Sequence, residues 1–289
     1  MLFLLLSILF SSLIFVIFTH WGQRKGHLYP VIWVNYGTCL LFGEGFGSLM
    51  GEGTWRLGNV QDPAFMLLFS MGLLFVGTFL LMGTATRRAG AASAATATKL
   101  SLVIPMGAAV WLYGEPLGWS LVISVLLSII SIGLFSASEG LKFDPILLAV
   151  FAGAGLVDAA LNAIRQSFHS HMNDWQQSTV IFGSAFLFGS LGLLKSEWRQ
   201  QFSGSAVRMG FLLGLVNFFS IVFLLRGLHF FQGATATFFA FNNVGILLLT
   251  TLAAWVFFKQ PMGFYRWMGL LLALLAIASA YFNLLWTQA

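Results

Sequence analysis

Long apolar segments recur along the whole chain, and they restrict its fold more than any other feature. An α-helix needs about 20 apolar residues to cross a bilayer core roughly 30 Å thick. Ten segments of about that length can be drawn, at residues 2–20, 28–47, 64–85, 89–111, 116–136, 145–167, 175–194, 206–228, 232–257 and 262–286. The sequence therefore predicts an all-α polytopic membrane protein with ten transmembrane helices.

The composition excludes a soluble protein and argues against a nucleic-acid partner. Hydrophobic residues make up 58% of the chain and charged residues 8%, which is about a third of the usual charged share. The net charge is +5, but no run of basic residues is longer than two. A surplus of Lys and Arg in short loops is expected of a protein in the bacterial inner membrane. The N-terminal segment lacks a basic region before it, so we expect a transmembrane helix and not a cleaved signal.

The two halves of the chain resemble each other. The stretch 111–119, WLYGEPLGW, recurs in outline as 255–264, WVFFKQPMGF, and Gly83 and Gly227 close the preceding segments. A repeat of five helices is odd-numbered, so two copies in tandem enter the membrane in opposite senses. The sequence thus predicts two inverted five-helix repeats, residues 1–140 and 141–289, an arrangement typical of alternating-access transporters.

The distribution of Lys and Arg predicts the orientation. The connections after the odd-numbered segments carry Arg24, Lys25, Arg87, Arg88, Lys142, Lys195, Arg199, Arg208, Lys259 and Arg266. The opposite side carries only Arg56, Arg165 and Arg226. The positive-inside rule then places both termini outside the cytoplasm.

Lys99 is the most informative single residue, because it lies near the middle of the fourth segment. About ten residues on either side, at about 1.5 Å each, separate it from the membrane faces, which is too far for its side chain to reach. A lysine at such depth normally faces a protein interior or a water-filled path. The alternative is a permanent ion pair that only stabilises the assembly.

Other polar groups of the fourth segment are candidates for the same site. Thr96 and Ser101 flank Lys99 and bring hydroxyl groups to its depth. Pro105 removes one helical hydrogen bond, frees the carbonyl group of Ser101 and should kink the helix beside the lysine. We therefore predict a substrate-binding site around Thr96, Lys99 and Ser101.

The sixth segment supplies the expected partner of Lys99. Asp158, Asn162 and Arg165 are spaced to share one helical face, and Asp158 is the carboxylate expected deepest in the membrane. A cycle in which substrate and a proton compete for the Lys99–Asp158 pair is one hypothesis, with H⁺ as the coupling ion. A static ion pair with Arg165 as an interfacial anchor is the other.

Asn242 and Asn243 occupy the place that the repeat assigns to the counterpart of Lys99. Amides in apolar surroundings need hydrogen-bond partners, and either a substrate or a neighbouring helix can provide them. Both interpretations stay open.

No motif predicts an enzyme, a metal centre or a resident cofactor. The chain lacks a nucleophile elbow, a zinc-protease helix and a dinucleotide-binding pattern. His169, His171 and Asp174 are a weak candidate for a metal cluster, and we expect no metal there. Stripes of small residues at Ser120, Ser124 and Ser128, and at Gly269 and Ala273, suit tight helix packing within the chain or across a homodimer.

These patterns resemble a known family. Thr96–Pro105 followed by Gly114-Glu115-Pro116-Leu117 is similar to the drug/metabolite transporter (DMT) superfamily, and within it to the EamA-like transporters. The stretches Leu5–Ser11 and Lys99–Pro105 look most like members from Bacteroidetes-type bacteria. The resemblance implies a basket of eight helices around a central cavity, with the fifth and tenth at the periphery. It also implies both termini in the cytoplasm, which the Lys and Arg distribution contradicts.

The leading hypothesis is a secondary active transporter of a small polar or amphipathic metabolite, exporting or importing it around a central cavity. Lys99 and Arg165 favour a substrate with an anionic group, and the 31 phenylalanines favour one with an apolar portion. The alternatives are a translocase of a lipid or lipid carrier and, with less support, a membrane enzyme or an assembly factor.

Overall fold

The computed structural model contains α-helices, short turns and short 3-10 segments, and no strand occurs in the part of the chain that it describes. It describes residues 1–49, 51, 60–113, 119–137, 144–167, 172, 174–230 and 235–288, some helix positions by their backbone alone. The elements are α1 (Leu2–Gln23), α2 (Leu28–Leu49), α3 (Phe65–Leu100), α4 (Val103–Tyr113), α5 (Trp119–Ala137), α6 (Pro145–Ser167), α7 (Asp174–Ser190), η2 (Leu191–Leu194), α8 (Ser196–Arg199), α9 (Gly204–Phe230), α10 (Thr235–Phe258) and α11 (Phe264–Gln288).

The helices have the length and composition of membrane spans. Six helical segments in the described ranges are long and apolar enough to cross a bilayer: Leu2–Gln23, Phe65–Pro105, Trp175–Leu194, Gly204–Leu224, Phe241–Phe258 and Phe264–Phe282. Shorter apolar helical stretches lie at Val122–Phe135 and Pro145–Leu161. The chain is therefore a multi-pass, all-helical membrane protein, as the apolar segments predict.

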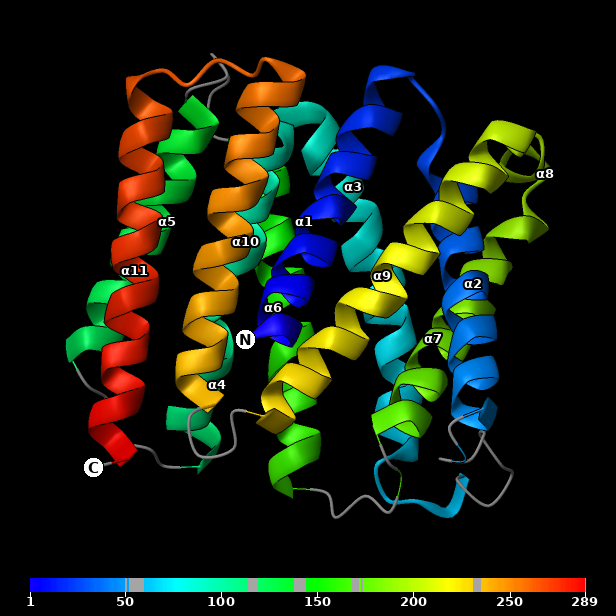
Figure 1. The fold of residues 1–289 in the computed structure, drawn as a ribbon, viewed down its shortest axis with the longest axis horizontal. Coiled ribbons are helices and arrows are strands. Elements are labelled where there is room, and N and C mark those ends of the chain that lie inside the picture. The colour runs from blue at the N-terminus through cyan, green and yellow to red at the C-terminus, as the bar shows by residue number, and fades with distance from the viewer. Residues whose placement is uncertain are drawn as a thin grey trace.

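α3 contains the third predicted segment and the first part of the fourth, as two helical parts that meet at a kink at Gly90. Gly90 has φ 84° and ψ 161°, outside the helical region, and only glycine adopts such angles without strain. Figure 1 shows α3 rising to one end of the bundle and returning behind α10. The sequence placed this boundary at Arg87 and Arg88, and the helix in fact continues to Ala89.

The helices stand side by side in an elongated bundle. In Figure 1, α11 and α5 form one edge and α2 and α7 the other, while α9 crosses obliquely between α1 and α2. α5 packs on α11, α2 on both α7 and α9, and α1 on α9 and α10. The two parts of α3 pack on α6 and α7, among others.

Serine hydroxyls bind α5 to α11 at three levels. Ser124 Oγ donates to the carbonyl of Ala276 at 2.8 Å, and Ser131 Oγ to that of Gly269 at 2.7 Å. From the other side, Ser279 Oγ donates to the carbonyl of Ser120 at 2.7 Å. Along these three bonds the residue number on α11 falls as the residue number on α5 rises, so the two helices are antiparallel. The small-residue stripes thus form a seam within the chain.

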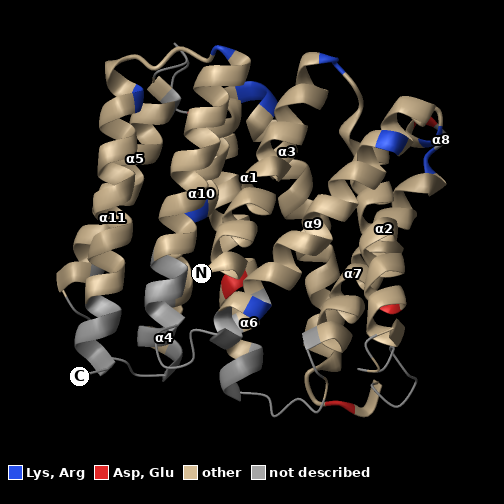
Figure 2. Cartoon of the chain, in the orientation of Figure 1, with Lys and Arg blue, Asp and Glu red and all other residues tan. Residues whose placement is uncertain are grey.

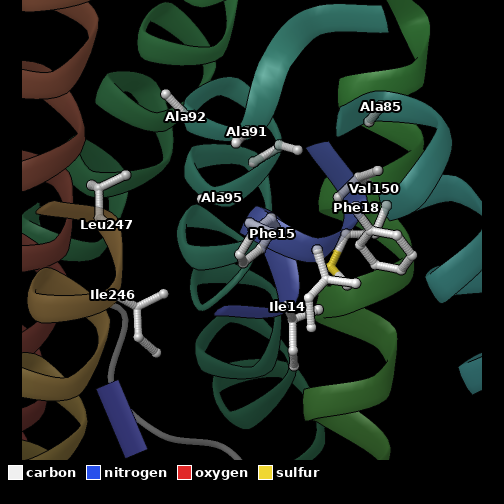
Figure 3. Close-up of a cluster of buried hydrophobic side chains, with 14 of the residues drawn as sticks. Ile14, Phe15, Phe18, Ala85, Ala91, Ala92, Ala95, Val150, Ile246 and Leu247 are labelled. Atoms are coloured by element: carbon white, nitrogen blue, oxygen red, sulfur yellow. The ribbon is translucent and has the colours of Figure 1, made fainter. Parts of the chain in front are cut away.

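An apolar cluster fills the bundle between α1, α3 and α10. Figure 3 shows Phe15 of α1 beside Ala91 and Ala95 of α3, with Ile246 of α10 on the same side, while Phe18 of α1 lies toward Val150 of α6. All six side chains are at most 3% exposed. The alanines let the helices approach closely, because they fill little of the space between two backbones.

Gly90→Ala should destabilise the fold. The substitution forces a side chain into a backbone region that costs about 1–3 kcal/mol, and its Cβ would lie 2.7 Å from Oε1 of Gln260. We expect a lower midpoint of thermal unfolding in detergent. Gly77→Ala, in the same helix and with no atom within 4 Å of its Cβ, is the control and should be neutral or stabilising. Equal behaviour of the two variants would contradict this account of the turn.

Candidate functional site

Lys99 lies at the C-terminal end of α3, where the helix is interrupted. α3 ends at Leu100, Ser101 and Leu102 form a turn, and α4 begins at Val103. Pro105 has no N–H for the carbonyl of Ser101, which accepts instead from the backbone N–H of Ile104 at 2.9 Å. The Lys99 side chain is partly exposed, as is that of Thr98, although residues 91–97 of α3 are all buried.

Thr96 and Ser101, predicted as substrate ligands, use their hydroxyls within their own segment. Thr96 Oγ1 donates to the carbonyl of Ala92 at 2.8 Å, and Ser101 Oγ to that of Thr98 at 2.6 Å. Both residues have 0% exposure. In this conformation they stabilise the backbone around Lys99, and their contact with a substrate stays a prediction.

Asp158 faces Lys99 from α6. It is the fourteenth of the 23 residues of Pro145–Ser167, and Figure 2 shows charged positions well inside the bundle near α6 and α10. The charges of Lys99 and Asp158 interact, yet the described residues contain a single ion pair within 4.0 Å, between Arg88 and Asp144. Asp158 is also exposed, so the neighbouring helices do not enclose its side chain.

Asn243 and Tyr281 continue this polar layer on α10 and α11. Asn243 Nδ2 donates to Tyr281 Oη at 3.3 Å, and the two side chains are 8% and 6% exposed. Tyr281 also interacts electrostatically with Asp158. Four helices, α3, α6, α10 and α11, therefore bring Lys99, Asp158, Asn243 and Tyr281 into one connected group.

Asn242 differs from its neighbour Asn243. Its side chain is 1% exposed, and neither its Nδ2 nor its Oδ1 has a hydrogen-bond partner. An unpaired buried amide is unfavourable. Its hydrogen-bonding groups can be satisfied by a ligand or in a second conformation of the protein. Its role as a substrate ligand stays a prediction.

The remaining predicted residues fall outside what the structure describes. The backbones of Asn162 and Arg165 belong to α6, but their side chains are outside the described part. His169, His171 and the side chain of Asp174 also lie outside the described part. Among the described residues, no group of three His, Cys, Asp or Glu side chains could hold a metal ion.

Tyr281 is the residue that sequence reasoning missed. It lies in the tenth apolar segment, which the family resemblance placed at the periphery. A tyrosine near the end of an apolar helix resembles an ordinary interfacial residue, and its partner Asn243 is 38 positions away. Only the packing of α10 on α11 reveals its place in the interior.

A second polar cluster, between α2 and α9, serves helix packing. Asn217 Nδ2 donates to Asn35 Oδ1 at 3.2 Å, and Cys39 Sγ donates to the carbonyl of Gly214 at 3.3 Å. Asn35, Cys39 and Asn217 are at most 3% exposed. These bonds hold two helices together, as expected of polar groups at helix interfaces in membranes.

A chain of aromatic contacts runs from α1 across α9 to α2. Ring centroids of Phe10 and Phe223 are 5.3 Å apart, those of Phe219 and Phe223 5.7 Å, and those of Phe46 and Phe219 5.9 Å. These four rings are all partly exposed. Together they form an aromatic wall that apolar groups can contact.

One end of the bundle is basic, and two of its arginines connect neighbouring helices. Figure 2 shows Lys and Arg positions gathered at the end where α1 finishes and α11 begins. There, Arg87 Nη1 donates to the carbonyl of Gly26 at 3.1 Å, and Arg88 Nε lies 3.9 Å from Asp144 Oδ2. The turn of α3 is thereby joined to the α1–α2 connection and to the start of α6.

Comparison with known proteins supports the fold and assigns no activity. No family model matches the chain. A Haemophilus influenzae protein (strain ATCC 51907 / DSM 11121 / KW20 / Rd), described as "Uncharacterized protein", is 28% identical over 231 residues, 77% of this chain and 76% of its own length. A solved structure described as "Crystal structure of protein" is similar with a TM-score of 0.56 at 14% identity, covering 95% of both chains. At that identity the likeness concerns the fold alone.

Water access to Asp158 can be measured by cysteine labelling. In a Cys39→Ser background, Asp158→Cys should react in membrane vesicles with the charged thiol reagent MTSES, because water supports the reactive thiolate. Leu126→Cys, at an exposed position of α5, is the matched control and should stay unlabelled, since hydrocarbon suppresses thiolate formation. An unreactive thiol at position 158 with a reactive one at 126 would place Asp158 against lipid.

Proposed function

We propose that the chain is a secondary active transporter of a small polar or amphipathic metabolite, similar to the EamA-like members of the DMT superfamily and located in the bacterial inner membrane. In this proposal ten transmembrane helices form two inverted five-helix repeats, residues 1–140 and 141–289. The substrate binds at the polar layer around Lys99 and Asp158, and the two repeats exchange conformations to alternate access. Asp158 is the candidate carrier of a coupling proton.

The observation that carries the proposal is an exposed carboxylate inside an apolar bundle, opposite a lysine that it does not touch. Asp158 and Lys99 interact electrostatically without an ion pair within 4.0 Å. A charge in a membrane interior is stable only beside water or polar groups. A gap between an ammonium and a carboxylate, reached by solvent, can admit a polar solute, whereas a structural ion pair would be closed and dry.

The packing of the helices supports the inverted repeat. In the proposed repeat, α1 corresponds to α6, α2 to α7 and α5 to α11. The first part of α3 corresponds to α9, and its second part together with α4 corresponds to α10. Several observed pairs then have a counterpart: α1 packs on α9 as α6 does on α3, and α1 on α10 as α6 does on α4. The pairs α2–α7 and α5–α11 each consist of two corresponding helices, so interchanging the two repeats leaves these pairs unchanged.

Glycine contacts repeat in the same way. A Cβ on Gly72 of α3 would meet Ser184 and the backbone of Ala185 on α7. A Cβ on Gly214 of α9 would meet Thr38 and the carbonyl of Asn35 on α2. Each half thus brings a glycine against the second helix of the other half, which favours a common ancestry of the two five-helix units.

The charge distribution supports an orientation with the basic end in the cytoplasm. Figure 1 shows the C-terminus at the end of the bundle opposite the basic one, and the N-terminus lies away from the basic end as well. Because Lys and Arg in short connections stay on the cytoplasmic side, both termini would lie outside the cytoplasm.

The aromatic wall favours a substrate with an apolar portion. Partly exposed rings on α1, α2 and α9 offer contact area to an apolar group, while Lys99 offers a charge to a carboxylate. We therefore propose small organic carboxylates with an apolar portion as the first solutes to examine.

Reconstituted flux tests the function. Proteoliposomes should accumulate a carboxylate that also raises the thermal stability of the purified protein, by about 2.7 kcal/mol at a hundredfold excess over Kd. Lys99→Ala should abolish this flux and leave the unfolding midpoint without ligand nearly unchanged. Lys195→Ala, which removes an exposed lysine at the basic end, is the matched control and should transport normally.

Two results would contradict the proposal. Undiminished flux in the Lys99→Ala protein would remove the lysine from the transport mechanism. Lipid scrambling in the same vesicles, without flux of any small carboxylate, would favour the lipid translocase instead.

A further inference from the structure

The α5–α11 pair lies at one edge of the bundle, yet it sends one polar side chain into the central layer. Tyr281 projects from α11 with 6% exposure, and its Oη accepts a hydrogen bond from Asn243 Nδ2 at 3.3 Å. Tyr281 also interacts electrostatically with Asp158. One hydroxyl group thus connects the edge of the bundle to α10 by a hydrogen bond.

The position of Tyr281 is fixed by its own helix. Ser279, two residues earlier, donates to the carbonyl of Ser120, and the bonds from Ser124 and Ser131 repeat the connection at two further levels. A helix held in this way places its side chains with little freedom. The phenol oxygen therefore stands at a defined point beside α10.

The bond from Asn243 determines how that amide is oriented. Because Nδ2 donates to Tyr281, the Oδ1 atom points elsewhere, and no hydrogen bond to it is found among the described residues. The atom is not fully enclosed, and the Asn243 side chain as a whole is 8% exposed. A carbonyl oxygen presented in this way accepts hydrogen bonds and does not donate them.

We propose that Tyr281 is a positioning residue that fixes the Asn243 amide so that its carbonyl oxygen accepts a hydrogen bond from a donor group of the solute. This inference rests on the transport function proposed above and adds a specificity to it. The carboxylate of the solute meets Lys99, and a neighbouring hydroxyl or N–H of the solute meets Asn243 Oδ1. Without Tyr281 the amide rotates freely and the preference for a donor is lost.

Two probes that differ by one hydroxyl test the inference. The affinities of 3-phenylpropionate and of 2-hydroxy-3-phenylpropionate are measured by calorimetry on the purified full chain. The wild-type protein should bind the hydroxy acid roughly threefold to tenfold more tightly, the ratio that one neutral hydrogen bond provides. Tyr281→Phe should bring that ratio close to one while 3-phenylpropionate binds as before.

A double-mutant comparison separates positioning from a general structural role. Asn243→Ala should also remove the preference, and Tyr281→Phe should have no further effect on the ratio in the Asn243→Ala background. A structural role would weaken both probes equally and leave the ratio unchanged. Tyr265→Phe, which alters an exposed tyrosine at the other end of α11, is the matched control and should preserve the wild-type ratio.

Each remaining outcome has a distinct meaning. If the wild-type protein prefers the hydroxy acid and Tyr281→Phe keeps that preference, the inference is overturned and the proposed function stands. Equal binding of both probes by the wild-type protein overturns the inference as well. If the wild-type protein binds neither probe, the proposed site for small carboxylates fails, and the inference fails with it.

Discussion

Holding the Lys99 ammonium and the Asp158 carboxylate inside an apolar bundle is the constraint on which the rest of the structure depends. Charges in a membrane interior require water, a counter-charge or hydrogen-bonding groups, and here the two interact without direct contact. The helix break at Ser101 and the Asn243–Tyr281 bond place further polar atoms at this layer. The neighbouring alanine-rich cluster between α1, α3 and α10 is apolar, which sets this layer apart from the interior beside it.

The same small residues allow the helices to pack closely and bring their polar groups within hydrogen-bonding distance. Alanines, glycines and serines let backbones approach until side-chain hydroxyls reach carbonyls of the next helix, as Ser131 does with Gly269. Helix association in lipid depends on such contacts because the hydrophobic effect does not drive helices together there. The seam between α5 and α11 therefore uses the small-residue stripes within one chain, where the sequence alone also allowed a contact between two chains.

The sequence was sufficient to predict an all-helical, multi-pass membrane protein and insufficient to predict the contacts between the helices. The length of the apolar segments predicts roughly where the helices lie in the sequence, since a turn or a charged connection separates consecutive segments. Pro105 predicts a disturbance at Ser101, because a missing N–H acts on its own helix. The Gly90 turn was placed slightly too early, since a glycine's φ depends on the neighbouring chain. Tyr281 could not be predicted, because its importance arises from Asn243 on another helix, and the side chains of Asn162 and Arg165 stay predictions.

The three hydroxyl bonds between α5 and α11 have a mechanical consequence. Two helices bonded at one level can pivot against each other, whereas bonds at three levels along their length oppose both pivoting and sliding. We therefore expect the pair to move as one rod, with a tilt at one membrane surface carried toward the other. Because Tyr281 belongs to that rod, any tilt of it displaces the phenol oxygen relative to α10 and strains the bond to Asn243.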